Sequence, residues 1–365
     1  MKSSEILNGQ AVIKVIGVGG AGGNAINRMV LGKMKSVHLI AMNTDAQALE
    51  QNKANKKIQI GIQSTKGLGA GGDPSKGATA AKESEKAINE ILEGSDMLFI
   101  TAGMGGGTGT GAAPAIAEMA RKKGILTVGI VSKPFLFEGP RRRQIAEEGT
   151  RKLKEHVDTL IVVPNNRLLS LVDKRTTMQQ AFITADEVLK QGVQGITDII
   201  MMPGMINVDF ADVRSVMKDA GVALMGLGKG VGHDRARFAA ETAANSPLLE
   251  TSIQGAKKLL VNITAGADFS LNETHEAMDY LLKFAHTEDL EVFMGHVYKE
   301  DIEGVHICLL ATGMDPKTAE SSALPGKAVI NQKEQKEQAE EKKEEQMQNI
   351  FDIPDFLKNY ISDKS

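Results

Sequence analysis

Residues 103–111 read GMGGGTGTG, so glycine fills six of nine positions directly after the apolar stretch at 97–100. Glycine loses more backbone freedom on folding than any other residue, at a cost of about 0.5–1 kcal/mol relative to alanine in a regular element. A run with this cost indicates that the local structure requires backbone without side chains. Something is expected to approach the main chain closely here.

Strand-like and helical segments alternate on both sides of this run. Apolar, β-branched stretches predict strands at 11–18, 37–45, 97–103 and 125–132. Helical spacing of apolar residues predicts helices at 24–34, at about 77–92 and at 113–124. This alternation predicts an α/β fold with a Rossmann-like, parallel-sheet nucleotide-binding domain at the N-terminus. Ligands of such sheets bind at the carboxyl ends of the strands, where the glycine loops lie.

The second half of the chain begins with one long predicted helix at 176–203, stopped by the Pro-Gly pair. Four further strand candidates lie at 222–230, 257–266, 290–300 and 305–313. Helical stretches near 233–246 and 271–286 separate them. This pattern predicts a second α/β domain.

The character of the chain changes from about residue 317. Residues 333–348 contain only Lys, Glu, Gln, Ala and one Met, a composition that predicts a disordered tail. Apolar residues return in FDIPDFLKNY, which indicates a docking peptide on a solvated tether. The predicted parts are therefore an N-terminal extension (1–10), a nucleotide-binding domain (11–175), a central helix (176–203), a C-terminal domain (204–316), a flexible linker (317–348) and a partner-binding peptide (349–365).

Composition limits the classes of function. The net charge is -3 and the sequence pI is about 6.2, so the chain has no bulk attraction to nucleic acid or to an anionic membrane. The first ten residues lack a signal-peptide core, and no apolar stretch reaches the roughly 18–20 residues of a membrane helix. The one cysteine, Cys308, lies in an apolar run that predicts a buried strand. We therefore expect a cytoplasmic protein. We also expect no zinc site, since no histidines have an HExxH spacing.

Two glycine runs point to phosphate chemistry, because GVGGAGGN at 17–24 and GMGGGTGTG each follow a strand and open a helix. Free N–H groups and a helix N-terminus at such a junction favour a phosphate chain. The hydroxyls of Thr108 and Thr110 add donors. The chain has no GxxxxGK[ST] motif, so the standard P-loop is absent.

Two alternatives remain open on these residues. The pattern Gly17-x-Gly19-x-x-Gly22, with Asp45 downstream, also matches a dinucleotide-dependent oxidoreductase, although a second glycine loop and the lack of a hydride-transfer constellation count against it. A nucleotide-regulated scaffold without catalysis is the other alternative.

The loops together resemble a known family. GMGGGTGTG is similar to the signature loop of the tubulin/FtsZ superfamily. GVGGAGGNA, Asn43-Thr44-Asp45, KPFLFEGPRRR, PNNRLL and PGMINVDFADV resemble the remaining loops of bacterial FtsZ proteins in the same order, over residues 11–315 and again in the terminal DIPDFLK. The resemblance implies that 11–175 binds GTP or GDP and that 204–316 is a GTPase-activating domain.

The same resemblance implies a set of nucleotide contacts. The phosphate contacts would be Gly20, Ala21, Gly22, Gly23, Asn24, Gly107, Thr108 and Gly109. Further nucleotide-binding residues would be Asn43, Asp45, Gly106 and Thr110. Gly71 and Gly72 correspond to the loop that senses the γ-phosphate, although the residues alone also fit a surface turn. Glu138 would accept from the ribose and Arg142 would reach the nucleotide, with Pro140 as a departure from the family and a solvated anion patch as the alternative.

Guanine recognition is expected from Phe182 and Asp186, which are spaced i, i+4 on one helix face, together with Asn165. A carboxylate accepts from the two adjacent N–H groups that guanine offers and adenine lacks. Without the family, Phe182 is equally a core residue and Asp186 a solvated charge.

The resemblance also assigns catalysis and partners. Asp209 and Asp212 would polarise water in the pocket of the next subunit, with Asn207 in support and Mg²⁺ offsetting charge, whereas the residues alone also predict a helix cap. The implied assembly is a head-to-tail homopolymer at the mid-cell division ring. Its other implied partners are assembly regulators and membrane-tethering division proteins such as FtsA. The tail residues implied in tethering are Asp352, Ile353, Pro354, Phe356, Leu357 and Lys358.

Overall fold

The computed structural model describes residues 11–34, 37–169, 173, 175–202, 204–287, 289–300 and 302–314. These residues all belong to one compact unit. The predicted N-terminal extension, the linker, and the terminal peptide with its six partner-binding residues lie outside the described residues.

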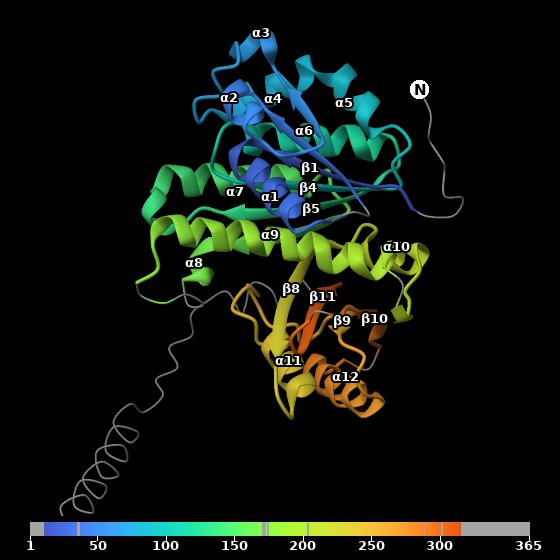
Figure 1. The fold of residues 1–365 in the computed structure, drawn as a ribbon. Coiled ribbons are helices and arrows are strands. Elements are labelled where there is room, and N and C mark those ends of the chain that lie inside the picture. The colour runs from blue at the N-terminus through green and yellow to red at the C-terminus, as the bar shows by residue number, and fades with distance from the viewer. Residues whose placement is uncertain are drawn as a thin grey trace, which may run out of the picture. The chain divides into compact units, whose positions relative to one another are not determined.

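One sheet of 11 strands runs through the described chain in the order β3-β2-β1-β4-β5-β6-β8-β11-β9-β10-β7 (Figure 1). Its strands are β1 (Ile13–Val18), β2 (His38–Asn43), β3 (Lys56–Gln59), β4 (Met97–Gly103), β5 (Leu126–Lys133), β6 (Thr159–Pro164), β7 (Gly204–Ile206), β8 (Gly221–Gly230), β9 (Lys258–Ala265), β10 (Glu291–Tyr298) and β11 (Val305–Thr312). All pairs from β3 to β8 are parallel. Beyond β8 the sheet is mixed, because β11 is antiparallel to both β8 and β9. The N-terminal parallel sheet is therefore confirmed.

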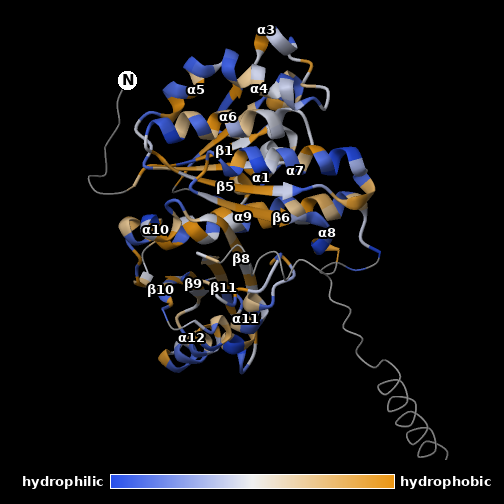
Figure 2. Ribbon diagram, turned by 180° about the vertical axis from the view of Figure 1, so that it is seen from behind, coloured by the Kyte–Doolittle hydropathy of each residue, from blue (hydrophilic) through white to orange (hydrophobic). Residues whose placement is uncertain are grey.

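Helices cover both faces of the parallel half. The helices are α1 (Gly19–Leu31), α2 (Ala46–Glu50), α3 (Ile62–Thr65), α4 (Pro74–Glu83), α5 (Glu85–Leu92), α6 (Thr108–Lys122), the 3-10 turn η1 (Leu136–Glu138), α7 (Pro140–Lys154), α8 (Asn165–Leu168), α9 (Met178–Met201), α10 (Phe210–Met217), α11 (Arg235–Ala244) and α12 (Leu271–Ala285). One core cluster joins α1, α9 and α10 to one face, and a second joins α4, α5, α6 and α7 to the other. Figure 2 shows the strands of the parallel half, between these two helix layers, as predominantly hydrophobic.

The alternation of side chains along β1 explains the two cores. Ile13 and Val15 point into the cluster under α1 and α9, whereas Ile16 and Val18 point into the cluster under α6. Strands buried on both faces read as continuous apolar runs, as β1 and β4 do. A third cluster packs α11 and α12 against β8, β9 and β11, so the second half of the chain also has the α/β packing that its sequence predicts.

The long helix is confirmed as α9, with 24 residues and a start at Thr177, whose hydroxyl accepts from the Gln180 N–H at 3.2 Å. Its buried face includes Leu189, Val193 and Ile196, which share one cluster with residues of both halves of the sheet. In Figures 1 and 2, α8 lies near one end of α9 and α10 near the other.

Three helix predictions are wrong in their bounds, and the first of them, at 24–34, is α1, which already begins at Gly19 inside the first glycine run. The single helix at 77–92 is two helices, α4 and α5, because the chain breaks at Ser84, whose hydroxyl instead accepts from the Gly61 N–H at 3.0 Å. The helix predicted at 113–124 begins earlier, at Thr108 inside the glycine run.

Cys308 lies in β11 as predicted, and burial raises the pKa of its thiol to about 12. Among the described residues, no helix combines the length and the hydrophobicity that a membrane span requires.

Candidate nucleotide-binding site

The two glycine runs meet at the carboxyl edge of the parallel sheet. The Gly109 α-carbon lies so close to the carbonyls of Gly103 and Val18 that an added Cβ would stand 3.0 and 3.1 Å from their oxygens. Gly19, with a φ of +74°, leaves only 2.9 Å between an added Cβ and the Gly109 nitrogen. The loops after β1 and β4 are therefore packed backbone to backbone.

Several glycines in these loops are required by packing alone. A Cβ on Gly22 would collide with the Thr101 carbonyl oxygen, and one on Gly111 with the Pro74 carbonyl oxygen. A Cβ on Gly107 would lie 2.7 Å from the Ala70 Cβ. These positions bring α1, α4 and α6 close to the strands and to one another.

Other glycines face open space. A Cβ on Gly20 or Gly106 would meet nothing within 4 Å, and neither residue has a positive φ. Gly71 and Gly72 are equally open, although their φ values of +61° and +76° favour glycine in their own right. The fold does not require glycine at Gly20 and Gly106, so these two leave room for a ligand against the main chain.

The threonine hydroxyls hold the loops together. The Thr44 and Thr108 hydroxyl oxygens lie 2.6 Å apart, which links the loops after β2 and β4. The Thr110 hydroxyl accepts from the Gly105 N–H at 2.9 Å, which closes the turn of the glycine run.

The loop after β2 is held by its own polar side chains. Asn43 accepts from the Asp45 N–H through its Oδ1 at 3.2 Å. Asp45 caps α2 by accepting from the N–H groups of Gln47 and Ala48. Asp45 therefore has a structural role that the dinucleotide alternative did not foresee. Ala21 and Gly23 are half-buried and Asn24 is exposed, all within the first turns of α1.

At the end of β5, Glu138 is fixed by two partners. One carboxylate oxygen accepts from the Phe135 N–H at 2.9 Å, and the other is paired with the Arg142 guanidinium. Pro140 is the first residue of α7, where its missing N–H has no cost. The departure at Pro140 therefore leaves the Glu138–Arg142 pair intact.

Three phenylalanines gather beside this loop. Phe182 of α9 meets Phe135 edge to face, with ring centroids 5.3 Å apart, and Phe137 at 6.3 Å. Phe135 and Phe137 are stacked at 5.0 Å. Phe182 is 38% exposed and Phe137 is 57% exposed, so apolar ring surface remains open to solvent. Sequence reasoning missed Phe135 and Phe137, although the segment KPFLFEGPRRR contains both.

Two buried polar groups lie at the same end of α9. Asn165, at the start of α8, is only 5% exposed, and its Oδ1 has no hydrogen-bond partner among the described residues. Asp186 lies one helical turn after Phe182, and burial raises the pKa of its carboxyl to about 7, against a smaller opposing effect of Arg28. Unsatisfied buried groups such as the Asn165 Oδ1 are rare, so this side chain fits a ligand that supplies an N–H donor. The Asp186 carboxylate can accept from the same ligand when it is ionised.

The acidic loop lies at the opposite end of α9. Asn207 accepts from the Gly204 N–H at 2.8 Å, and Asp209 caps α10 by accepting from the Asp212 N–H at 2.8 Å. The Asp212 carboxylate has no hydrogen-bond or ion-pair partner in the part of the chain that the structure describes. A helix rises 1.5 Å per residue, so about 30 Å of α9 separates Phe182 from its last residue. The two groups of predicted site residues are therefore not brought together within one chain.

Glycine loops at the carboxyl edge of a parallel sheet, beside a helix N-terminus, define a phosphate-binding α/β protein. Comparisons with known proteins agree. A profile of the Tubulin/FtsZ family GTPase domain matches residues 12–173, and a profile of the FtsZ family C-terminal domain matches residues 221–315.

Solved structures give the same result. An FtsZ dimer from M. jannaschii, described as empty, is 43% identical with a TM-score of 0.80, and the match covers 83% of this chain and 88% of that one. A mutant FtsZ from M. jannaschii matches with 43% identity and a TM-score of 0.80, over 84% of this chain and 92% of that one. CetZ2 from Haloferax volcanii, described as a GTPγS-bound protofilament, is 19% identical and shows the fold alone, with a TM-score of 0.70 over 88% of this chain and 99% of that one. The chain belongs to the tubulin/FtsZ family, and it is a GTPase.

Proposed function

We propose that this GTPase assembles head to tail into filaments and hydrolyses GTP at the contact between two subunits. One observation carries the proposal: the nucleotide loops and the acidic loop lie at opposite ends of α9. The nucleotide face of one subunit would then contact the acidic-loop face of the next subunit. Such a head-to-tail contact is heterologous, and it propagates as a filament when the rotation between subunits does not close a ring.

In this proposal the backbone of the two glycine runs surrounds the triphosphate. Gly20 and Gly106 leave open space for it, and the N-termini of α1 and α6 supply partial positive charge. The loop at Gly71 and Gly72 meets the γ-phosphate. Glu138 and Arg142 lie at the ribose end.

Guanine is recognised by the end of α9. The ionised Asp186 carboxylate accepts from two adjacent N–H groups of the base, and the unpaired Oδ1 of Asn165 accepts a further hydrogen bond. Phe182 supplies a ring face or edge for the base. Because burial raises the pKa of Asp186 to about 7, nucleotide binding would remove a proton from part of the population.

Hydrolysis requires the acidic loop of the next subunit. Asp212, whose carboxylate is uncommitted, orients the attacking water, while Asp209 holds the first turn of α10 in place and Asn207 holds the loop before it. No group of three or more His, Cys, Asp or Glu side chains suited to a metal occurs among the described residues. Mg²⁺ is therefore proposed to bind mainly through the triphosphate oxygens, where it offsets their charge.

Assembly has independent support from related proteins. A related FtsZ is described as a dimer and CetZ2 as a protofilament. Exposed apolar side chains lie beside both groups of loops, with Leu68 85% exposed next to the loop at Asp45 and Met205 87% exposed before the acidic loop. Loss of the γ-phosphate would remove contacts from the interface and weaken it.

Membership of the family supports a proposal for the cellular role. We place the filament at the mid-cell division ring on the inner face of the membrane, in the cytoplasm. Membrane-tethering division proteins and assembly regulators are its expected partners, with the terminal peptide as the tether site. Neither nucleic acid nor direct membrane insertion is part of this proposal.

A concentration series tests the shared active site. GTP turnover per molecule is measured while the protein is diluted, for the wild type, for Asp212→Ala and for a control at an exposed carboxylate of α12, Glu276→Ala. Turnover per molecule should fall on dilution for the wild type and the control, because interfaces dissociate. Asp212→Ala should bind GTP normally and hydrolyse it at least about 100-fold more slowly. Turnover per molecule that stays constant at every dilution would contradict the proposal.

A further inference from the structure

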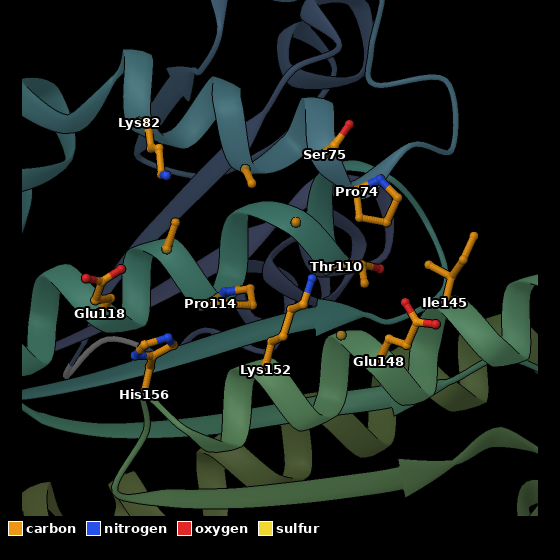
Figure 3. A pocket seen from close by; sticks show the side chains of 14 residues that line it. Pro74, Ser75, Lys82, Thr110, Pro114, Glu118, Ile145, Glu148, Lys152 and His156 are labelled. Carbon is orange, nitrogen blue, oxygen red and sulfur yellow. The ribbon is translucent and has the colours of Figure 1, made fainter.

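A cavity of about 350 Å³ lies between α4, α6 and α7, on the sheet face opposite α9 (Figure 3). It lies away from the open space at Gly20 and Gly106, although Thr110 and Gly111 at the end of the glycine run belong to its lining. Its lining residues are Pro74, Ser75, Ala78, Lys82, Thr110, Gly111, Pro114, Ala115, Glu118, Ile145, Glu148, Gly149, Lys152 and His156.

Close helix packing creates this cavity. A Cβ on Gly111 would collide with the Pro74 carbonyl oxygen, and one on Gly149 would collide with the Thr110 side chain. These glycines draw the three helices together at one end. The small side chains of Ala78 and Ala115 then leave an apolar hollow between the same helices.

The wall charges favour an anion. Lys82 and Lys152 extend into the cavity from α4 and α7 (Figure 3), and neither ammonium group has a hydrogen bond or salt bridge with any described residue, although Lys82 contributes to a lowered pKa of Glu118. Glu118 is already paired with Lys122 at 2.7 Å. Glu148 has only a long contact of 3.5 Å with Gln144, so the cavity has two ammonium groups and one carboxylate that are outside any salt bridge.

We propose that this cavity binds a small amphipathic carboxylate, with its apolar body against Pro114 and Ala115 and its acid group between Lys82 and Lys152. The volume is at the lower end of the range for small-molecule pockets, about 300–1,000 Å³, which excludes a folded partner. An apolar floor with a few placed charges is the usual composition of such sites.

Occupancy of the cavity is coupled to nucleotide binding. Each wall helix begins at a nucleotide loop: α4 after Gly72, α6 at Thr108 and α7 directly after Glu138 and Gly139. Because the helices are packed through glycine backbones, a ligand that separates them displaces those loops together. This second step depends on the nucleotide site proposed above. By linkage, GTP changes the affinity for the carboxylate by the same factor.

A cysteine in the cavity gives a direct probe. The native Cys308 is only half-buried, so the probe is placed in a Cys308→Ala background, where Ala115→Cys provides the one thiol. Dithiobis(nitrobenzoate) exchanges with it, forming a protein disulfide to one nitrothiobenzoate and releasing the other as a thiolate. The attached group is itself an aromatic carboxylate. Lys123→Cys, at the exposed end of α6, is the matched control.

The rate of labelling without nucleotide tests the ligand class. Adding Lys82→Met and Lys152→Met should slow the labelling of Ala115→Cys at least about fivefold, because the cavity loses its attraction for the reagent, and should leave Lys123→Cys within about twofold. Equal slowing in both, or no labelling of Ala115→Cys with the wild-type melting temperature retained, would overturn the site.

Nucleotide affinity tests the coupling. Labelled Ala115→Cys should bind GTP at least about fivefold more weakly than the unlabelled variant, with recovery after reduction by dithiothreitol. Unchanged GTP affinity would overturn the coupling and leave the site itself standing. Failure of the unlabelled wild type to bind GTP would instead count against the proposed nucleotide site.

Discussion

At the scale of single residues, Gly20 and Gly111 both belong to glycine runs, yet they are glycine for different reasons. Gly111 has the Pro74 carbonyl where a Cβ would stand, whereas Gly20 has nothing within 4 Å. The sequence predicts that the runs meet a phosphate chain. It does not separate packing glycines from ligand glycines, because that depends on neighbours distant in sequence.

This difference predicts opposite effects of the same substitution. Gly20 lies in the first turn of α1, so Gly20→Ala should raise the stability of the nucleotide-free protein by about 0.5–1 kcal/mol and still weaken GTP binding at least tenfold. Gly111→Ala should lower the stability by at least about 2 kcal/mol, because a Cβ collides with backbone. Urea unfolding and nucleotide titration of the two variants check this. Normal GTP affinity in folded Gly20→Ala would contradict the assignment.

Asp186 gives a prediction on pH. Its folded pKa of about 7 lies above the model-peptide value of 3.8 because burial disfavours the charged form. The free energy of unfolding therefore carries no penalty from Asp186 below pH 3.8, where the carboxyl is neutral in both states. It decreases as pH rises from 3.8 through about 7, because the buried carboxyl must then ionise. Asp186→Asn should therefore stabilise the nucleotide-free protein more at pH 8.5 than at pH 5, with a difference of roughly 2–3 kcal/mol between the two pH values.

Unfolding of both proteins at the two pH values measures this difference. Guanine nucleotide affinity of the wild type should also decrease as pH falls below about 7, since the carboxylate must be ionised to accept from the base. An equal stability difference at both pH values would show that Asp186 titrates normally. Glu187→Gln, at a neighbouring acid paired with Lys190, serves as the control.

At the scale of elements, several long apolar patterns were predicted correctly, whereas the strand β6, the helix α7 and the break between α4 and α5 were not predicted. The apolar pattern of α9 and of strands β1, β4 and β8 is long enough to predict from sequence, and all four are confirmed. The edge strand β3 was missed because it has four residues and two of them are exposed. The break at Ser84 depends on its hydrogen bond to Gly61, which no local pattern reveals.

The start of α9 predicts a coupling between helix stability and base recognition. Thr177→Ala removes the cap that accepts from the Gln180 N–H and should lower the stability by about 1 kcal/mol. Phe182 lies in the second turn, so fraying should also weaken GTP binding by a few-fold. Thr177→Ser should restore both quantities because it keeps the hydroxyl. Weak binding that persists in Thr177→Ser would point to a different cause.

At the scale of the whole molecule, α9 fixes the distance between the nucleotide loops and Asp212. The sequence suggested both sets of residues through motifs, but motifs alone left Asp209 and Asp212 open between capping and catalysis. The structure shows that Asp209 caps α10 and that Asp212 does not use its carboxylate for capping. One subunit therefore has an uncommitted acid about 30 Å along α9 from its own base site.

The central claim is that one subunit's acidic loop completes another subunit's GTP site. The most direct measurement mixes two inactive variants: Asp212→Ala, with an intact pocket, and Gly106→Asp, which places a charge in the open space of the glycine loop but keeps its acidic loop. An equimolar mixture should recover up to about a quarter of the wild-type GTPase activity per subunit, since random head-to-tail pairing joins intact halves at that frequency. Activity in the mixture that equals the mean of the two separate variants would contradict the claim.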